Sequence, residues 1–247
     1  MRVEFLGTAG YHPNEARHTS CVYLPDAAPG HGFVLDAGTG LFRLIGRQLP
    51  PQLHIFLTHA HLDHVTGLTY LYNVLLNQEC EVTVYGTADC LETVRDELFD
   101  SPLFPLPFEY ELCIVEAGQK LSIDGVCVSF FPLTHPGGSL AYRFDWPHDS
   151  LAYITDTAGD ELYIDFIRGV DLLIHERNFS NSLHEVAVAS GHCTSESVGR
   201  VARQAKARRL ALTHFNPLTN TDPAEEDSLR IEFPEAVFAQ DGLTIEF

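Results

Sequence analysis

The chain has 247 residues, and 34 Asp and Glu against 15 Lys and Arg give it a net charge of −19, with its 13 histidines counted as neutral. Its 45% hydrophobic and 20% charged residues are typical of a globular protein and exclude a disordered chain. The negative balance argues against broad electrostatic binding to nucleic acid, because phosphates require Lys and Arg as counter-charges. A small phosphate-bearing substrate is compatible with this charge, since a bound cation can reverse the local field.

The chain shows no sign of export or of membrane insertion. Its first residues lack the long apolar stretch of a signal peptide, and no run of about 18 apolar residues follows. We therefore expect a cytoplasmic protein with no membrane partner and with reduced cysteines, none of which forms a C-x-x-C pair. The six cysteines are Cys21, Cys80, Cys90, Cys113, Cys127 and Cys193.

Strands and helices alternate in both halves of the chain. Nine short runs rich in Val, Ile, Leu and Phe predict strands, at residues 2–6, 32–35, 53–58, 81–85, 126–131, 140–144, 151–155, 171–175 and 209–213. An apolar stripe after His64 predicts one helix, and Thr87 and Thr194 are expected to cap two more. Residues 101–107 contain three prolines and are expected to form a surface loop. This alternation predicts one α/β domain, residues 1–247, with helices outside the sheets.

The sharpest local signal is a run of four potential metal ligands where a predicted strand ends and a helix begins. These residues are His59, His61, Asp63 and His64. Chain reversal there can point the first two at one cation and the last two at another, and imidazole with carboxylate suits Zn(II), Mn(II) or Fe(II). A chance histidine cluster is the alternative, but it explains a single histidine better than four ligands in this order.

Three further polar residues each follow a predicted apolar strand: His135, Asp156 and His214. Alone, a histidine or aspartate at a strand end is more often a turn residue. Together with the four earlier residues, these three complete two coordination shells, which chance does not explain.

This pattern resembles that of the metallo-β-lactamase-fold hydrolases, over essentially the whole chain. The resemblance implies a four-layer αββα sandwich of two similar halves, with two metal ions at one edge between the sheets. It implies one metal held by His59, His61 and His135, a second held by Asp63, His64 and His214, and Asp156 bridging both.

A finer resemblance is to the ribonuclease Z-like phosphodiesterase branch. It is carried by Phe-Leu-Gly-Thr at residues 5–8, Arg-His-Thr-Ser at 17–20, His-Pro-Gly-Gly at 135–138, residues 171–176 and Gly-His-Cys-Thr at 191–194. The resemblance implies that His192 enters the active site, where it donates a proton to the leaving oxygen or binds the scissile phosphate as a cation; a capping or surface role is the alternative. Asp63 is a candidate for proton transfer as well as for metal binding.

The expected reaction is hydrolysis by a hydroxide that bridges two divalent cations, with zinc favoured and manganese or iron as alternatives. A phosphodiester fits best, because its anionic oxygens bind two cations and its alkoxide leaving group needs an acid. Ribonuclease Z proper holds transfer RNA with an arm between the third histidine motif and the bridging aspartate. Here only 21 positions separate His135 from Asp156, and the residues after His214 lack that branch's Arg-Tyr pair.

The expected substrate is therefore a small phosphodiester, such as a cyclic nucleotide, a cyclic phosphate or a short oligonucleotide, rather than a large RNA. A thioester, ester or lactone hydrolase on the same metals, or a transfer-RNA 3′ processing ribonuclease, is the alternative. A non-catalytic metal-binding protein and a redox enzyme with two irons are less favoured. Relatives of this kind often form homodimers, so a homodimer is one expected assembly.

Several polar residues are expected to support the site. Asp36 is predicted to brace the metal-binding loop, and His175 and Glu176 to act as supporting or structural residues. Gly137 and Gly138 fit either a phosphate-binding loop or a turn that requires small residues.

Overall fold

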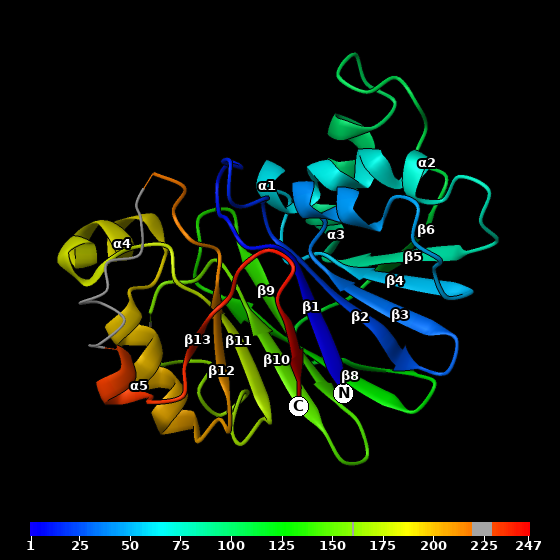
Figure 1. Ribbon diagram of the computed structural model, residues 1–247. Coiled ribbons are helices and arrows are strands. Elements are labelled where there is room, and N and C mark those ends of the chain that lie inside the picture. Colours follow the sequence, from blue (N-terminus) through cyan, green and yellow to red (C-terminus); the bar gives the residue numbers. More distant parts are fainter. Residues whose placement is uncertain (160, 219–228) are drawn as a thin grey trace.

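In the computed structural model, described for residues 1–159, 161–218 and 229–247, two seven-stranded sheets pack face to face (Figure 1). The first sheet has the strand order β14-β1-β2-β3-β4-β5-β6. Its strands are β1 (Arg2–Gly7), β2 (Cys21–Ala28), β3 (His31–Leu35), β4 (Gln52–Phe56), β5 (Glu81–Gly86), β6 (Glu111–Ile114) and β14 (Thr244–Glu246).

The second sheet has the order β13-β12-β11-β10-β9-β8-β7. Its strands are β7 (Lys120–Ile123), β8 (Val126–Leu133), β9 (Ser139–Asp145), β10 (Ser150–Ile154), β11 (Leu172–Glu176), β12 (Leu210–Thr213) and β13 (Val237–Phe238). Each sheet changes from antiparallel to parallel pairing partway across, at β3 in the first sheet and at β10 in the second. The two halves therefore repeat one plan.

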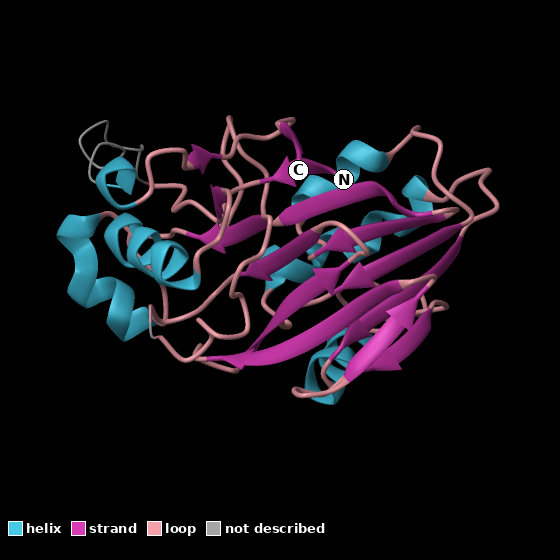
Figure 2. Ribbon diagram, turned by 90° about the horizontal axis from the view of Figure 1, so that it is seen from below, coloured by secondary structure: helices cyan, strands magenta, loops and turns pink. Residues whose placement is uncertain are grey.

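Helices cover the outer face of each sheet, so the molecule has four layers (Figures 1 and 2). The first sheet is covered by η1 (Thr39–Leu44), α1 (Leu62–Val65), η2 (Thr66–Tyr70), α2 (Leu71–Val74), α3 (Ala88–Thr93) and η3 (Val94–Leu98). On the side of the second sheet lie η4 (Asn181–Leu183), α4 (His184–Ser190) and α5 (Ser195–Ala205). Aromatic residues such as Phe33, Phe56 and Phe144 fill the core between the sheets.

All nine predicted strands are present, and the four-layer αββα sandwich is confirmed. Residues 101–107 form the predicted loop, and all six cysteines are free thiols. Thr194 caps α5 as expected, and the Thr87 hydroxyl accepts the backbone N–H of Cys90. Among the described residues, no helix is long and apolar enough to cross a membrane.

The predicted helix after His64 is not continuous but divides into α1, η2 and α2. Gly67 explains the break, because its N–H donates to the carbonyl of Ala37, 2.7 Å away, instead of to a carbonyl within the helix. A β-carbon at Gly67 would lie only 2.1 Å from the carbonyl oxygen of Gly38. The segment therefore gives up helical regularity to pack against the turn after β3.

Candidate metal centre

Strand ends from both sheets meet at one edge of the sandwich. The chain leaves β4 through His59 and His61 and enters α1, which carries Asp63 and His64. His135 follows β8, Asp156 follows β10 and His214 follows β12. Residues spread over more than 150 positions of the sequence are thus brought to one place, because the carboxyl ends of parallel strands lie at the same edge of a sheet.

The side chains form two groups, within each of which the potential ligand atoms lie within 4.8 Å of one another. One group contains His59, His61, His135 and Asp156, and the other contains Asp63, His64 and His214. Asp156 lies between the two groups. Its Oδ2 is 3.6 Å from Nε2 of both His59 and His135, and its Oδ1 is 3.4 Å from Nε2 of His64 and 3.1 Å from Nε2 of His214.

The contacts inside these groups place ring nitrogens against ring nitrogens. Nε2 of His64 and Nε2 of His214 are 3.2 Å apart, and Nδ1 of His61 is 3.4 Å from Nε2 of His135. Nε2 of His59 is buried and has no hydrogen-bond partner among the described residues. A set of nitrogen and carboxylate donors of this kind, in which only His61 is exposed, is satisfied by divalent cations, so the residues fit the metal ions that the sequence predicts.

A second ring of contacts fixes which nitrogen of His59, His135 and His214 faces inward. Nδ1 of His59 lies 3.0 Å from the Thr58 hydroxyl, and Nδ1 of His135 lies 3.0 Å from the carbonyl oxygen of Gly191. The amide of Asn178 lies 3.1 Å from Nδ1 of His214. With Nδ1 held from outside, Nε2 is the atom presented to the centre, which is the usual arrangement around a protein-bound metal.

Asp36 holds the fourth of these histidines and is the residue expected to brace the metal-binding loop. Its Oδ2 is 2.8 Å from Nδ1 of His64 and accepts the hydroxyl of Tyr153 at 2.9 Å, while its Oδ1 accepts the backbone N–H of Thr58 at 2.8 Å. The side chain is fully buried. Asp36 therefore connects the end of β3 to both ends of the loop that carries the candidate ligands.

Burial and charge prepare the candidate ligands for a cation. Burial lowers the pKa of His59, of His61 and of His135, which keeps these imidazoles neutral with a lone pair available. Burial alone would raise the pKa of Asp63 and of Asp156, but the neighbouring His64 and His214 outweigh it and lower both. The carboxylates and these three imidazoles therefore have the protonation state that metal binding requires. Burial would lower the pKa of His64, but the charges of Asp63, Asp156 and Asp36 outweigh it and raise that pKa, so a cation must displace a proton from His64.

His192 lies beside both groups and has a partner of its own. It forms a third close set with Asp156 and His214, and its ring centroid is 5.1 Å from that of His135. Its Nδ1 is 2.9 Å from Oε1 of Glu176. Burial lowers the pKa of His192, but the charge and hydrogen bond of Glu176 outweigh burial and raise it to about 9. Glu176 therefore favours the protonated form of His192.

Glu176 was expected to be a supporting or structural residue, and in the structure it orients His192. It lies at the end of β11 and is fully buried. Oε1 accepts the backbone N–H groups of Thr157 and Cys193, both at 3.2 Å, and Oε2 accepts that of Asn178 at 2.9 Å. These donors fix the carboxylate in its orientation toward His192. Only the strand-end position of Glu176 signalled this role in the sequence.

The loop after His135 is explained by its turn. Gly137 and Gly138 have φ values of +83° and +82°, which glycine adopts without strain. The N–H of Gly138 donates to the carbonyl of His135 at 2.9 Å, and the hydroxyl of Ser139 donates to the carbonyl of Thr155 at 3.1 Å. Of the two interpretations of this segment, the structure favours the turn.

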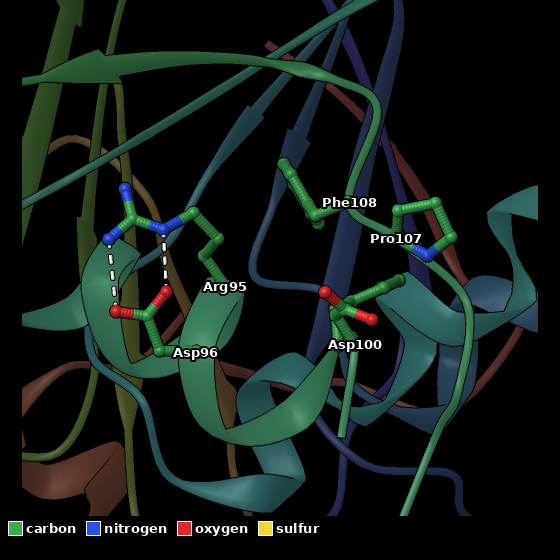
Figure 3. A pocket seen from close by; sticks show the side chains of 6 residues that line it. Arg95, Asp96, Asp100, Pro107 and Phe108 are labelled. Carbon is green, nitrogen blue, oxygen red and sulfur yellow. Dashed lines mark hydrogen bonds and ion pairs between the residues drawn. The ribbon is translucent and has the colours of Figure 1, made fainter. Parts of the chain in front are cut away.

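A cavity of about 580 Å³ opens over the two groups. Its described lining is His61, Asp63, His135, Asp156, His192 and His214 at the floor, with Tyr11, Leu62, Pro136, Asn178, Phe179, Ser190, Asn216 and Leu218 around them. None of these described residues is Lys or Arg. A different hollow, of about 450 Å³ beside η3, contains Arg95 (Figure 3), but Arg95 pairs with Asp96 there at 2.6 Å. The cavity over the histidines is therefore the candidate substrate-binding site, because it exposes the candidate metal ligands.

Comparison with known proteins gives the class of this fold and site. The family model described as Beta-lactamase superfamily domain matches residues 22–215. The chain therefore belongs to this family, and it is a metal-dependent hydrolase with the metallo-β-lactamase fold, as the sequence predicted. It is 28% identical to the ribonuclease Z of Parasynechococcus marenigrum, over 100% of this chain and 98% of that protein.

Two solved structures share the fold over nearly their whole length. One is the metallo-beta-lactamase fold protein YhfI from Bacillus subtilis, with a TM-score of 0.83 and 22% identity, covering 99% of this chain and 98% of that one. The other is the short form of human tRNase Z, with a TM-score of 0.76 and 23% identity, covering 100% and 99%. The predicted resemblance to ribonuclease Z-like proteins is thus confirmed.

Proposed function

We propose that this protein is a phosphodiesterase that hydrolyses small phosphodiesters with two divalent cations. His59, His61 and His135 would hold one cation, Asp63, His64 and His214 the other, and Asp156 would bridge them. Zinc is the proposed metal, because sets of histidine and aspartate are typical zinc ligands. The observation that carries the proposal is the His192–Glu176 pair, a proton donor placed directly beside both groups of ligands.

When bound, two such cations supply Lewis-acid chemistry, lowering the pKa of water and neutralising charge on phosphoryl oxygens. The chain itself supplies the proton. Because Nδ1–H of His192 donates to Glu176, Nε2–H is the group directed at the cavity, where it can protonate an alkoxide as it leaves. Asp63 lines the same cavity, so its carboxylate is also proposed to accept a proton from the attacking water.

Two observations support a small substrate. The described lining of the cavity has no Lys or Arg, and the whole chain carries a charge of −19, so a long RNA backbone would meet no Lys or Arg in this cavity and a net negative charge on the protein. Between β9 and β10 there is only a tight turn, closed by the N–H of Trp146 donating to the carbonyl of Asp149 at 2.9 Å. The segment between His135 and Asp156 therefore has no protruding arm with which to hold a folded RNA.

Processing of transfer-RNA 3′ ends is the second candidate, favoured by the full-length match to a protein named ribonuclease Z. That alignment spans 311 positions although this chain has 247 residues, so about 64 positions of the relative have no counterpart here. The chain therefore lacks residues that this relative has, which weighs toward the smaller substrate.

The test compares protein reconstituted with Zn(II) or Mn(II) with a chelated control, on bis(4-nitrophenyl) phosphate, a cyclic nucleotide and a precursor transfer RNA. We expect chelator-sensitive hydrolysis of the first two. His192→Ala should lower turnover of the cyclic nucleotide by about 10²–10⁴-fold, and turnover of the nitrophenyl ester less, because nitrophenolate leaves without an acid. His184→Ala, an exposed histidine on α4, is the matched control and should change neither.

Each contrary result points to a definite alternative. Efficient cleavage of the precursor transfer RNA alone would replace the proposal with the second candidate. Failure to hydrolyse any diester, with both metals measured as bound, would overturn the phosphodiesterase. Turnover of a thioester or lactone that is insensitive to His192→Ala would then indicate a carbonyl substrate.

A further inference from the structure

Tyr11 combines two features that its packing does not require. Its φ is +61°, in the left-handed region that a bulky side chain adopts only with strain, and its side chain is 77% exposed. The other seven described non-glycine residues with positive φ are all Asp, Asn, Lys or His. A glycine would adopt this conformation freely, so the backbone does not account for a tyrosine at this position.

The backbone of this segment has a clear structural reason. The N–H of Tyr11 donates to Oδ2 of Asp63, 2.6 Å away, and that carboxylate belongs to one of the two ligand groups. Gly10 packs so closely on the site that a β-carbon there would lie 2.4 Å from Cε1 of His214. Its own N–H donates to the carbonyl of Phe215 at 2.9 Å. The loop between β1 and β2 is thus fixed as one wall of the cavity.

The Tyr11 ring belongs to a set of exposed apolar side chains around the mouth of that cavity. Leu62, the first residue of α1, is 67% exposed, and Leu218, beyond β12, is 79% exposed. All three line the cavity that has the histidines and Asp156 at its floor. Away from its floor, the cavity therefore offers apolar surface and side-chain amides, and its described lining offers no further positive charge for a second phosphate.

We propose that Tyr11 determines specificity, its ring stacking on a flat substituent of the phosphodiester, a nucleobase or an aryl group. This inference rests on the proposed function and narrows its substrate class to diesters with one negative charge and a flat apolar group. Stacking of a base on an aromatic side chain changes affinity by about 5- to 150-fold. Through its N–H, the same residue also holds Asp63, so the substrate contact and the ligand share one fixed loop.

The test measures binding as well as turnover, with protein reconstituted with zinc. Calorimetry compares adenosine 5′-phosphate with ribose 5-phosphate, which differ only in the base. We expect the wild-type protein to bind the first at least about 5-fold more tightly. Tyr11→Gly should remove this difference while keeping the metal content and the thermal stability, because glycine retains the N–H and accepts the positive φ. Tyr11→Phe should keep the difference.

Two further variants test whether the effect comes from the loss of the Tyr11 ring. Asn77→Gly makes the same change at an exposed residue with φ +60° beyond the end of α2, and should leave the preference intact. Tyr11→Asn replaces the ring by a side chain that tolerates positive φ, and should act like Tyr11→Gly. For turnover, adenosine 2′,3′-cyclic phosphate is compared with 1-O-methylribose 2,3-cyclic phosphate, and the ratio of their kcat/KM values should fall in Tyr11→Gly and Tyr11→Asn but not in Asn77→Gly.

An equal affinity of the wild-type protein for the two monophosphates would overturn the inference, even if diesters are hydrolysed. So would a Tyr11→Gly protein that keeps the preference, or one that loses it together with its metal, since Tyr11 would then act only through Asp63. If the preference exists and depends on the ring but no diester is hydrolysed, the proposed function fails and the binding site stands. The two failures are thus distinguishable.

Discussion

Each half of the molecule has an aspartate directly after one corresponding strand, but the two carboxylates have different surroundings. Asp36 follows β3 and Asp156 follows β10, the strands at which each sheet changes from antiparallel to parallel pairing. Both are buried, and both have positive φ, +56° and +49°. The Asp36 carboxylate accepts hydrogen bonds from Thr58 and Tyr153 and contacts one histidine. That of Asp156 accepts the Thr155 hydroxyl at 2.7 Å and faces the inward ring nitrogens of four histidines.

The next strand of each half shows a similar division. The segment after β4 carries His59 and His61, whereas β11 ends in Glu176, which accepts three backbone N–H groups and orients His192. The first half thus contributes most of the candidate ligands, and the second half contributes Asp156 and His192, the proposed bridging carboxylate and proton donor. The repeated fold fixes where a side chain stands, and the neighbouring donors decide whether it binds a cation or braces a residue that does.

Asp156→Asn tests whether the carboxylate between the two groups of ligands is needed for metal binding and turnover, and it is expected to have the largest effect. The amide removes the negative charge between the two groups and places N–H hydrogens against imidazole nitrogens. We expect a loss of turnover on any diester of at least about 10³-fold, because the chemistry depends on both cations. Elemental analysis should show less than two metals per chain. Two retained metals with full turnover would contradict the role of Asp156.

Asp36→Asn is the matched variant in the other half. Because Asp36 contacts His64 from outside, the expected effect is weaker metal binding, by about 10- to 100-fold, with turnover largely recovered at saturating metal. Competition with a chelator measures the affinity. The variant should also unfold more easily, by about 1–3 kcal/mol, because a buried acceptor of several hydrogen bonds is altered. If Asp36→Asn and Asp156→Asn changed metal affinity and turnover equally, the distinction between a metal ligand (Asp156) and a residue that supports a ligand (Asp36) would be contradicted.

Much of this could be predicted from the sequence, because the candidate ligands are chemically distinctive and each follows an apolar strand. The strand β2 was missed since it contains Pro25 and Asp26, which the shift of register between Leu24 and Ala28 accommodates. The edge strands β6 and β7 were missed because they are short and only partly buried. Because they are short and partly exposed, β6 and β7 lack the continuous apolar run that identified the central strands.

The supporting residues of the site were harder to predict. The role of Asp36 could be anticipated from its position after a strand beside the metal-binding loop. The contacts of Glu176, Asn178 and Tyr11 depend on segments that are distant in the chain and meet only in the folded protein. No local pattern distinguishes such a glutamate or tyrosine from an ordinary turn residue. The sequence thus indicates the candidate metal ligands more clearly than it indicates the residues that orient them.

Glu176→Gln tests the proton donor of the second half. Glutamine keeps the shape but removes the charge that raises the pKa of His192, so the histidine is less often protonated at neutral pH. We expect turnover of a cyclic nucleotide to fall by about 10- to 100-fold, and that of bis(4-nitrophenyl) phosphate by less, with both metals retained. The ratio of the two rates is the readout, because a general loss of structure would lower both equally.

The smallest expected effect concerns a pair of buried histidines, one in each half, that contact a tyrosine hydroxyl. Nδ1 of His54 on β4 is 2.9 Å from the hydroxyl of Tyr85, and Nε2 of His175 on β11 is 2.8 Å from that of Tyr163. Burial, and then the charge of His31, lower the pKa of His54 to about 4, and burial lowers the pKa of His175. Both are therefore neutral in the folded protein.

In the unfolded chain a histidine has a pKa of about 6.5, so between about pH 6.5 and 4 the unfolded state binds more protons than the folded one. The free energy of unfolding should therefore fall as the pH drops through this range. His54→Gln removes one titrating group and keeps a side chain that can bond to Tyr85, so its pH dependence should be shallower by less than one proton. Urea unfolding of the metal-free proteins at several pH values measures this difference. Parallel curves for the variant and the wild type would mean that His54 is protonated equally in both states.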